Sequence, residues 1–164
     1  MNATQTLHAH LLQELRKQFD GDAWHGDALE VILEGISAAQ ASRRMGTAHS
    51  IWEIVLHIAG WTQEVTRRLQ GGEAGDPADG DWPAVADVSD AAWQDARRRL
   101  RELHQAVLVI VARVPPAELH APVQDFRNSP DGRGRTVAET ISGLIQHDVY
   151  HAGQIAILKR LVRD

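Results

Sequence analysis

Cysteine is absent from the 164-residue sequence, and aromatic residues are few, with one tyrosine and two phenylalanines. Without cysteine the chain can form no disulfide, no thiolate metal site and no iron–sulfur cluster, and it has no cysteine nucleophile. Long apolar runs are also missing, because the longest, residues 106–112, is far shorter than the about 20 residues of a membrane span. The N-terminal segment carries charges and histidines where a signal peptide would be apolar, so we expect a cytoplasmic protein with no membrane partner.

Positive charge is in short supply as well. Lys and Arg number 17 against 22 Asp and Glu, which gives a net charge of −5 with neutral histidine. Proteins that bind the phosphate backbone usually carry a positive surface, so we predict no nucleic-acid partner. The residue in excess is histidine, with nine copies in the chain.

Four long segments carry apolar residues at alternating steps of three and four, which is typical of amphipathic helices. Two of them open with a capping box, Ser50 to Glu53 and Thr136 to Glu139, in which hydroxyl and carboxylate satisfy the first free amides of a helix. The predicted helices cover residues 7–19, 50–70, 93–114 and 136 to the C-terminus, with a shorter helical piece at 27–35.

Two polar loops separate the later helices, at residues 71–88 and 115–135. The first is acidic and rich in glycine and proline, and we expect Trp82 to anchor it onto the body of the protein. No window alternates with the two-residue period of a strand. The pattern predicts an all-α protein in which residues 1–164 form a single domain, an up-and-down four-helix bundle.

The apolar face of the last helix is interrupted by His147, Asp148 and His151. Polar groups inside a core stripe are costly unless they are paired or bound to a metal. The two histidines lie four residues apart, so their rings share one face of the helix, and this spacing suits two imidazoles on one metal ion.

The second helix supplies a third histidine, His57, in bulky apolar surroundings. Three imidazoles would leave coordination positions open for water or substrate, which is typical of a catalytic metal site. All-nitrogen ligation favours Zn, Ni, Fe or Cu over Mg or Ca. The alternative is that no metal binds and that these histidines pack in the core with hydrogen bonds to their neighbours.

Other polar residues are candidates for the same site. Asp148 either acts as a base, as the Glu of H-E-x-x-H does, or orients a ligand histidine. Gln154 either reaches a bound ligand or bonds across helices, and Glu53, one turn before His57, is a candidate base whose capping role competes. His25 is a candidate at the mouth of the bundle.

The remaining histidines are expected outside the site. We expect His49, which comes just before the second helix, to lie on the surface or to have a neutral role at the helix N-terminus. The others are predicted to be exposed or capping residues: His8, His10, His104 and His120.

Two segments, H-D-V-Y-H-A-G-Q-I at 147–155 and S-I-W-E-I-V-L-H-I-A-G-W at 50–61, resemble the DinB/YfiT-like superfamily of bacterial proteins. The resemblance implies a four-helix bundle with a divalent metal, Zn or Ni first and Fe next, held by His57, His147 and His151. It also implies a homodimer. Some members are metal-dependent S-transferases or isomerases that use a low-molecular-weight thiol, and others are described as metal-dependent hydrolases.

Three functions therefore stay open. The first is a metal-dependent enzyme that activates a thiol cosubstrate for S-transfer to a small-molecule substrate. The second is a hydrolase in which the metal activates water. The third is a non-catalytic, dimeric binding or stress-response module that the metal only stabilises.

Overall fold

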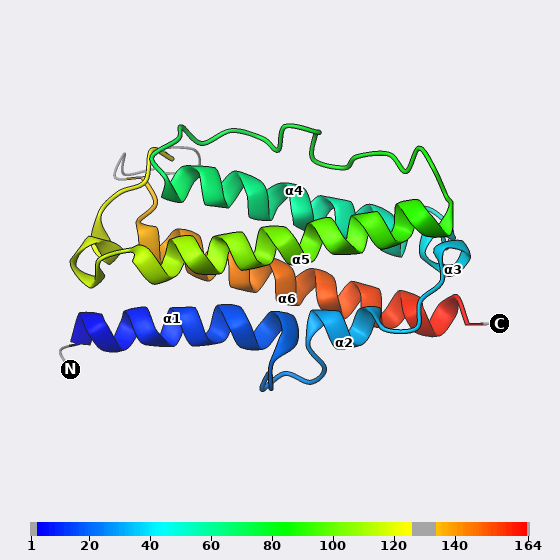
Figure 1. Ribbon diagram of the computed structural model, residues 1–164, viewed down its shortest axis with the longest axis horizontal. Coiled ribbons are helices and arrows are strands. Elements are labelled where there is room, and N and C mark those ends of the chain that lie inside the picture. Colours follow the sequence, from blue (N-terminus) through cyan, green and yellow to red (C-terminus); the bar gives the residue numbers. More distant parts are fainter. Residues whose placement is uncertain (1–2, 126–133, 164) are drawn as a thin grey trace.

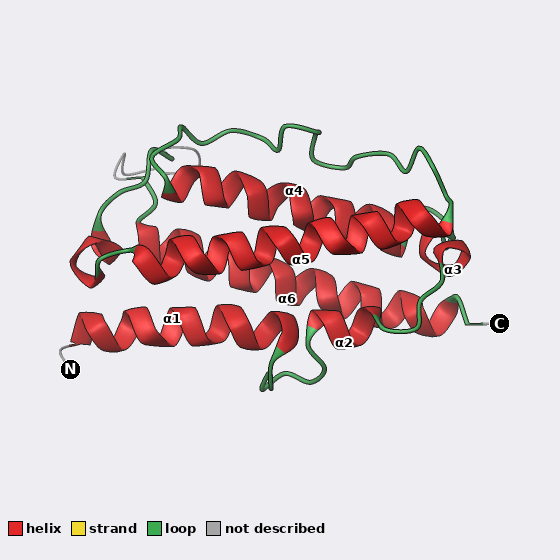
Figure 2. Cartoon of the chain, viewed as in Figure 1, coloured by secondary structure: helices red, strands yellow, loops and turns green. Residues whose placement is uncertain are grey.

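The computed structural model describes residues 3–125 and 134–163. The regular elements in this part of the chain are helices joined by loops, with one isolated bridge between Pro122 and Thr136 (Figure 2). Residues 126–133 of the predicted second loop lie outside the described residues. The helices are α1 (Ala3–Asp20), α2 (Leu29–Leu33), α3 (Ala38–Ser42), α4 (Ile51–Leu69), α5 (Asp90–Arg113), the 3-10 helix η1 (Pro116–His120) and α6 (Val137–Leu161).

The four long helices α1, α4, α5 and α6 lie side by side along the long axis of the molecule (Figure 1). Both predicted capping boxes are present. The Ser50 hydroxyl accepts a hydrogen bond from the Glu53 amide, and the Glu53 carboxylate accepts one from the Ser50 amide at 2.8 Å. Thr136 and Glu139 repeat the arrangement at the start of α6. These caps fix where the two helices of the candidate site begin.

Helices α4 and α5 run in the same direction. Trp52, near the start of α4, packs on Trp93, near the start of α5, with ring centroids 5.1 Å apart. Toward the other ends, Val65 of α4 and Val111 of α5 belong to the same apolar cluster. The alternating up-and-down order that we predicted is therefore wrong for this pair.

The physical reason is the length of the crossover, by which we mean residues 71–88. Extended chain covers roughly 3.3 Å per residue, so this segment can span about 60 Å. Helix α4 has 19 residues and is therefore only about 29 Å long. The crossover runs the whole length of α4 and returns the chain to the end from which α4 started (Figure 1).

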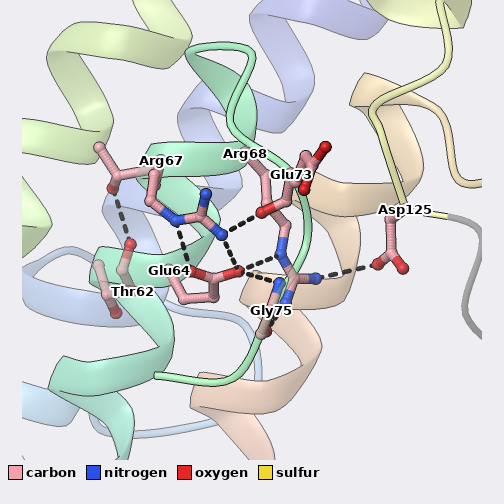
Figure 3. Close-up of polar contacts among 8 residues, drawn as sticks. Thr62, Glu64, Arg67, Arg68, Glu73, Gly75 and Asp125 are labelled. Atoms are coloured by element: carbon pink, nitrogen blue, oxygen red, sulfur yellow. Dashed lines mark hydrogen bonds and ion pairs between the residues drawn. The ribbon is translucent and has the colours of Figure 1, made fainter. Parts of the chain in front are cut away.

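A buried ion-pair network ties the crossover to α4 (Figure 3). The Arg68 guanidinium donates to Glu64 and to Asp125, each at 3.0 Å, and to the Gly75 carbonyl at 2.8 Å. Glu64 in turn accepts a hydrogen bond from the Gly75 amide at 2.7 Å. Two loops far apart in sequence are thus held against one helix.

Helix α6 lies between α1 and α4, and its partners fix its direction. Leu15 of α1 and Leu144 of α6 share an apolar cluster, and Gln18 bonds to Asp148 one turn further along both helices. Helices α1 and α6 are therefore parallel, and both run opposite to α4 and α5 (Figure 1). The candidate site lies where α4 and α6 face each other.

One predicted surface residue is in the core. His104 is 1% exposed and stacks on Phe19 of α1, with ring centroids 3.8 Å apart and planes 6° apart. It follows Leu100 by four residues, which places it on the apolar face that α5 turns toward α1. The expectation that His104 is exposed or capping is wrong for this reason.

Other differences are small. His8 is half-buried, with its Nε2 atom 2.8 Å from the Val111 carbonyl, whereas His10 and His120 are exposed as expected. The short elements α3 and η1 were not predicted, although Ser37 and Gln40 form a third capping box at the start of α3. Within the described ranges, none of the helices is both long and apolar enough to cross a membrane.

Candidate metal centre

Three histidines from two helices meet in one place, and we call them the triad: His57 of α4 with His147 and His151 of α6. One ring nitrogen from each lies within 4.8 Å of the other two, which is close enough to share a metal ion. The Nε2 atoms of His57 and His147 are 2.9 Å apart. The triad residues that the sequence suggested are therefore brought together.

The ring of His57 is held from the far side by the crossover. Its Nδ1 atom lies 2.6 Å from the backbone carbonyl oxygen of Asp81. A carbonyl can only accept, so Nδ1 carries the hydrogen and the Nε2 lone pair is left free toward the other two histidines. The Asp81 carboxylate accepts a hydrogen bond from the Trp61 indole at 2.7 Å, which fixes this part of the crossover on α4.

The two histidines of α6 have the same arrangement. His151 Nδ1 lies 2.7 Å from the Gln154 side-chain oxygen, and His147 Nδ1 makes a longer contact of 3.5 Å with Asp148 Oδ1. Oxygen acceptors behind each Nδ1 leave bare Nε2 atoms pointing at one another. Three convergent lone pairs repel each other unless a cation lies between them, and metal-bound histidines typically show such outer partners.

Trp82 covers one side of the triad. Its ring lies 3.9 Å from the His57 ring, with 8° between the planes, and its other face stacks on His49 at 3.7 Å and 2°. The predicted anchoring role of Trp82 is thereby confirmed. His49 is half-buried in this stack rather than free on the surface.

Burial keeps two of the triad histidines, His57 and His151, in the form that binds metals. His57 and His151 are each 5% exposed, and removal of water lowers the pKa of His57 below its usual value and that of His151 to about 4. The partner contacts at Nδ1 oppose this effect only in part. Both rings are neutral at pH 7, and a neutral imidazole is the metal-binding form.

Asp148 lies behind the triad and is 1% exposed. One carboxylate oxygen faces His147, and the other accepts a hydrogen bond from Gln18 Nε2 of α1 at 3.0 Å. Burial raises the pKa of Asp148, while these two partners favour the charged form. The geometry fits the orienting role and leaves the carboxylate turned away from the side on which a substrate would bind.

Two other predicted site residues, Glu53 and His25, do not contribute to the triad. Glu53 is taken up by its cap and by a bidentate ion pair with Arg44, which together lower its pKa to about 2 against the opposing effect of burial. His25 is exposed in the loop between α1 and α2 and does not belong to the triad.

The sequence interpretation missed Asp81, Gln18 and the stacking of His49. The Asp81 contact uses a backbone carbonyl, so no side-chain pattern could reveal it. Gln18 did carry a signal, because it is a polar residue between Leu15 and Phe19 on the apolar face of α1.

Two cavities reach the triad. One, of about 460 Å³, borders His147 and contains charged side chains, including Arg68, Asp125, Arg135 and Glu139. The other, of about 390 Å³, borders His151. Its lining residues are Ala48, His49, Ile54, Trp82, Tyr150, His151, Gln154, Ile157 and Leu158.

Fold and site together define an all-helical protein with a three-histidine group that could hold a metal ion. The family model described as DinB superfamily matches residues 22–155, and the chain belongs to this superfamily, whose members commonly bind a metal. Comparison with curated proteins and with solved structures gave no match.

Proposed function

We propose that this protein is a metal-dependent enzyme that activates a low-molecular-weight thiol for S-transfer to a small-molecule substrate. His57, His147 and His151 would hold a divalent transition metal, with Zn or Ni as the first candidates and Fe as the next. The observation that carries the proposal is the convergence of one ring nitrogen from each of three histidines, together with an oxygen acceptor beside each Nδ1.

The donor set fits a catalytic ion better than a purely structural one. Structural zinc sites usually have four protein ligands, whereas three nitrogen donors leave room for an exogenous ligand. When bound, such a cation supplies Lewis acidity that lowers the pKa of a coordinated thiol or water. The chain contains no cysteine, so the thiol must be a cosubstrate.

The chain's own residues orient the ligands and keep water out. Asp81 and Gln154 each accept a hydrogen bond from the ring of one histidine, which fixes its tautomer. Trp82 lies flat on His57 and excludes water from that face.

Hydrolysis is the weaker candidate because neither carboxylate suggested as a general base is free to assist a metal-bound water. Both carboxylates suggested for this role are engaged elsewhere, Asp148 with Gln18 and Glu53 with Arg44. A free thiol has a pKa of about 8.5 and ionises readily, whereas water ionises near 15.7 and depends more on a base. The absence of a positioned base among these candidates favours the thiol.

Metal analysis is the first test. We expect tag-free protein to bind about one Zn²⁺ or Ni²⁺ per chain. The substitution His147→Ala should lower the affinity for the ion by about tenfold or more. His120→Ala, an exposed histidine on η1, is the matched control and should bind like the wild type. Failure of the wild type to bind either ion would overturn the proposal.

The second test measures thiol consumption with a panel of low-molecular-weight thiols and a neutral aryl halide as acceptor. Turnover should require the metal and be lost in His147→Ala. Metal binding that raises the unfolding temperature without any turnover would favour the non-catalytic module instead. The homodimer stays a prediction, which light scattering tests.

A further inference from the structure

The cavity beside His151 differs in chemistry from the rest of the triad's surroundings. We call it the apolar cavity, defined by the nine lining residues given above. None of them is Lys, Arg, Asp or Glu, whereas the cavity beside His147 contains charges of both signs. An ionised group that entered the apolar cavity would lose its hydration without gaining a partner charge.

The apolar cavity is directly continuous with the proposed metal ligands. His151 forms part of its wall, and the Trp82 ring lies 5.9 Å from the His151 ring. The same indole stacks on His57. A molecule in this cavity would therefore touch one triad histidine. It would also meet the edge of the Trp82 indole, whose two faces are covered by His57 and His49.

The outer wall is made of large side chains that a folded protein would otherwise bury. Tyr150 and Ile157 lie two turns apart on α6 and are 65% and 63% exposed. Both line the apolar cavity, so they offer an aromatic ring and an aliphatic group to a ligand, and Trp82 adds the edge of its indole. The volume of about 390 Å³ falls within the range of small-molecule pockets.

We propose that the apolar cavity is a substrate pocket for an uncharged, apolar group, with aromatic groups preferred, and that it holds this group beside the triad. The inference rests on the proposed function, because it names the class of small molecule that the same site accepts. In S-transfer this molecule is the acceptor, and the thiol is the other reactant.

The test compares two dyes with the same anilinonaphthalene skeleton on full-length protein, in the metal-free and the Zn²⁺-loaded form. N-phenyl-1-naphthylamine is uncharged, whereas 8-anilinonaphthalene-1-sulfonate carries a negative charge. We expect one neutral dye per chain, and in the metal-free form we expect it to bind at least about tenfold more tightly than the sulfonate, because no cationic side chain lines the cavity. Equal binding of the two dyes would overturn the inference.

Variants locate the binding. Ile157→Glu places a charge in the exposed wall and should weaken the neutral dye about tenfold or more, while Zn²⁺ affinity and helix content stay unchanged. Val109→Glu is the matched control, since Val109 is 48% exposed on α5 outside the cavity. Ala48→Trp fills the cavity from an exposed loop and should have the same effect as Ile157→Glu. Wild-type dye affinity in both cavity variants would overturn the inference.

Two further readouts separate this inference from its rivals. Ni²⁺ at the triad quenches nearby fluorophores, so the bound dye should fluoresce less with Ni²⁺ than with Zn²⁺. Equal fluorescence with the two ions would place the ligand elsewhere.

If a second copy of the chain covers this face instead, light scattering will show a dimer that Ile157→Glu and Leu161→Glu both dissociate. Dye binding will then fall as the dimer forms.

The proposed function and the inference can fail separately. Zn²⁺ binding without preference for the neutral dye would overturn only the inference. Dye binding that Ile157→Glu weakens, in a protein that binds no metal, would support the cavity and overturn the proposed function.

Discussion

Gln18 donates a hydrogen bond to Asp148 across 3.0 Å, and this bond joins α1 to the helix that carries two of the three triad histidines. Gln18 is 3% exposed and Asp148 is 1% exposed, so the contact is sheltered from water. It holds the carboxylate that faces His147. The candidate metal centre therefore depends on a helix that contributes no ligand to it.

Replacing Gln18 should weaken metal binding without unfolding the protein. Gln18→Met keeps the length of the side chain and removes the amide, so Asp148 loses the donor that positions it. We expect the Zn²⁺ affinity, measured by calorimetry, to fall about tenfold, as is usual when an outer partner of a ligand is lost. Gln13→Met, an exposed change on the same helix, should leave the affinity unchanged. Equal affinities in both variants would mean that Asp148 needs no support from α1.

The Trp82 ring should matter for the same centre. Trp82→Leu removes the indole that lies on His57 and loosens the crossover that presents the Asp81 carbonyl. We expect a loss of Zn²⁺ affinity of about tenfold, with unchanged helix content by circular dichroism. Trp24→Leu is the control, because Trp24 is 98% exposed between α1 and α2. A wild-type affinity for Trp82→Leu would show that stacking does not position His57.

Arg68 should be important for stability. Its side chain is 7% exposed between Glu64 and Asp125, and Arg68→Met leaves these two buried carboxylates without their shared cation. We expect the free energy of unfolding, measured in urea, to fall by about 3 kcal/mol. Arg98→Met removes an exposed ion pair on α5 and should change it by less than about 0.5 kcal/mol. Similar losses in the two variants would argue against the special position of Arg68.

His104 should make stability depend on pH. Burial lowers its pKa to about 4 in the folded protein, against 6.5 as the ordinary value. A lowered histidine pKa means that the unfolded chain binds the proton first, so the stabilising effect is complete above pH 6.5. It is lost as the pH falls from 6.5 toward 4. Between pH 7.5 and pH 5 the loss amounts to about 2 kcal/mol.

The measurement is urea unfolding at the two pH values. His104→Phe keeps a flat ring against Phe19 and removes the titration, so its stability should fall less than that of the wild type over this interval. His10→Gln, at an exposed position on α1, should retain the wild-type difference. If His104→Phe shows the full wild-type pH dependence, His104 is not the group responsible.

Local signals predicted the helices and the His147–His151 pair, because both depend on spacing within a single helix. His57 lies on another helix and was suggested by its apolar surroundings and by the family resemblance. The capping boxes at Ser50 and Thr136 predicted where α4 and α6 begin. The polar residues His147 and His151 in the apolar stripe of α6 predicted the position of the candidate metal site. The direction of α5 could not be predicted, since the crossover is long enough for either arrangement. The Asp81 contact was equally hidden, because the docking of an irregular loop leaves no periodic pattern.

The separation of 90 residues between His57 and His147 has a consequence for biosynthesis. A chain made from its N-terminus completes α4 long before α6, so an emerging polypeptide holds only one of the three imidazoles. Joining segments so far apart also carries a large loop-closure entropy, which makes this contact a late event in folding. An ion would therefore bind after the helices have packed together. It would stabilise the folded bundle and would not start its folding.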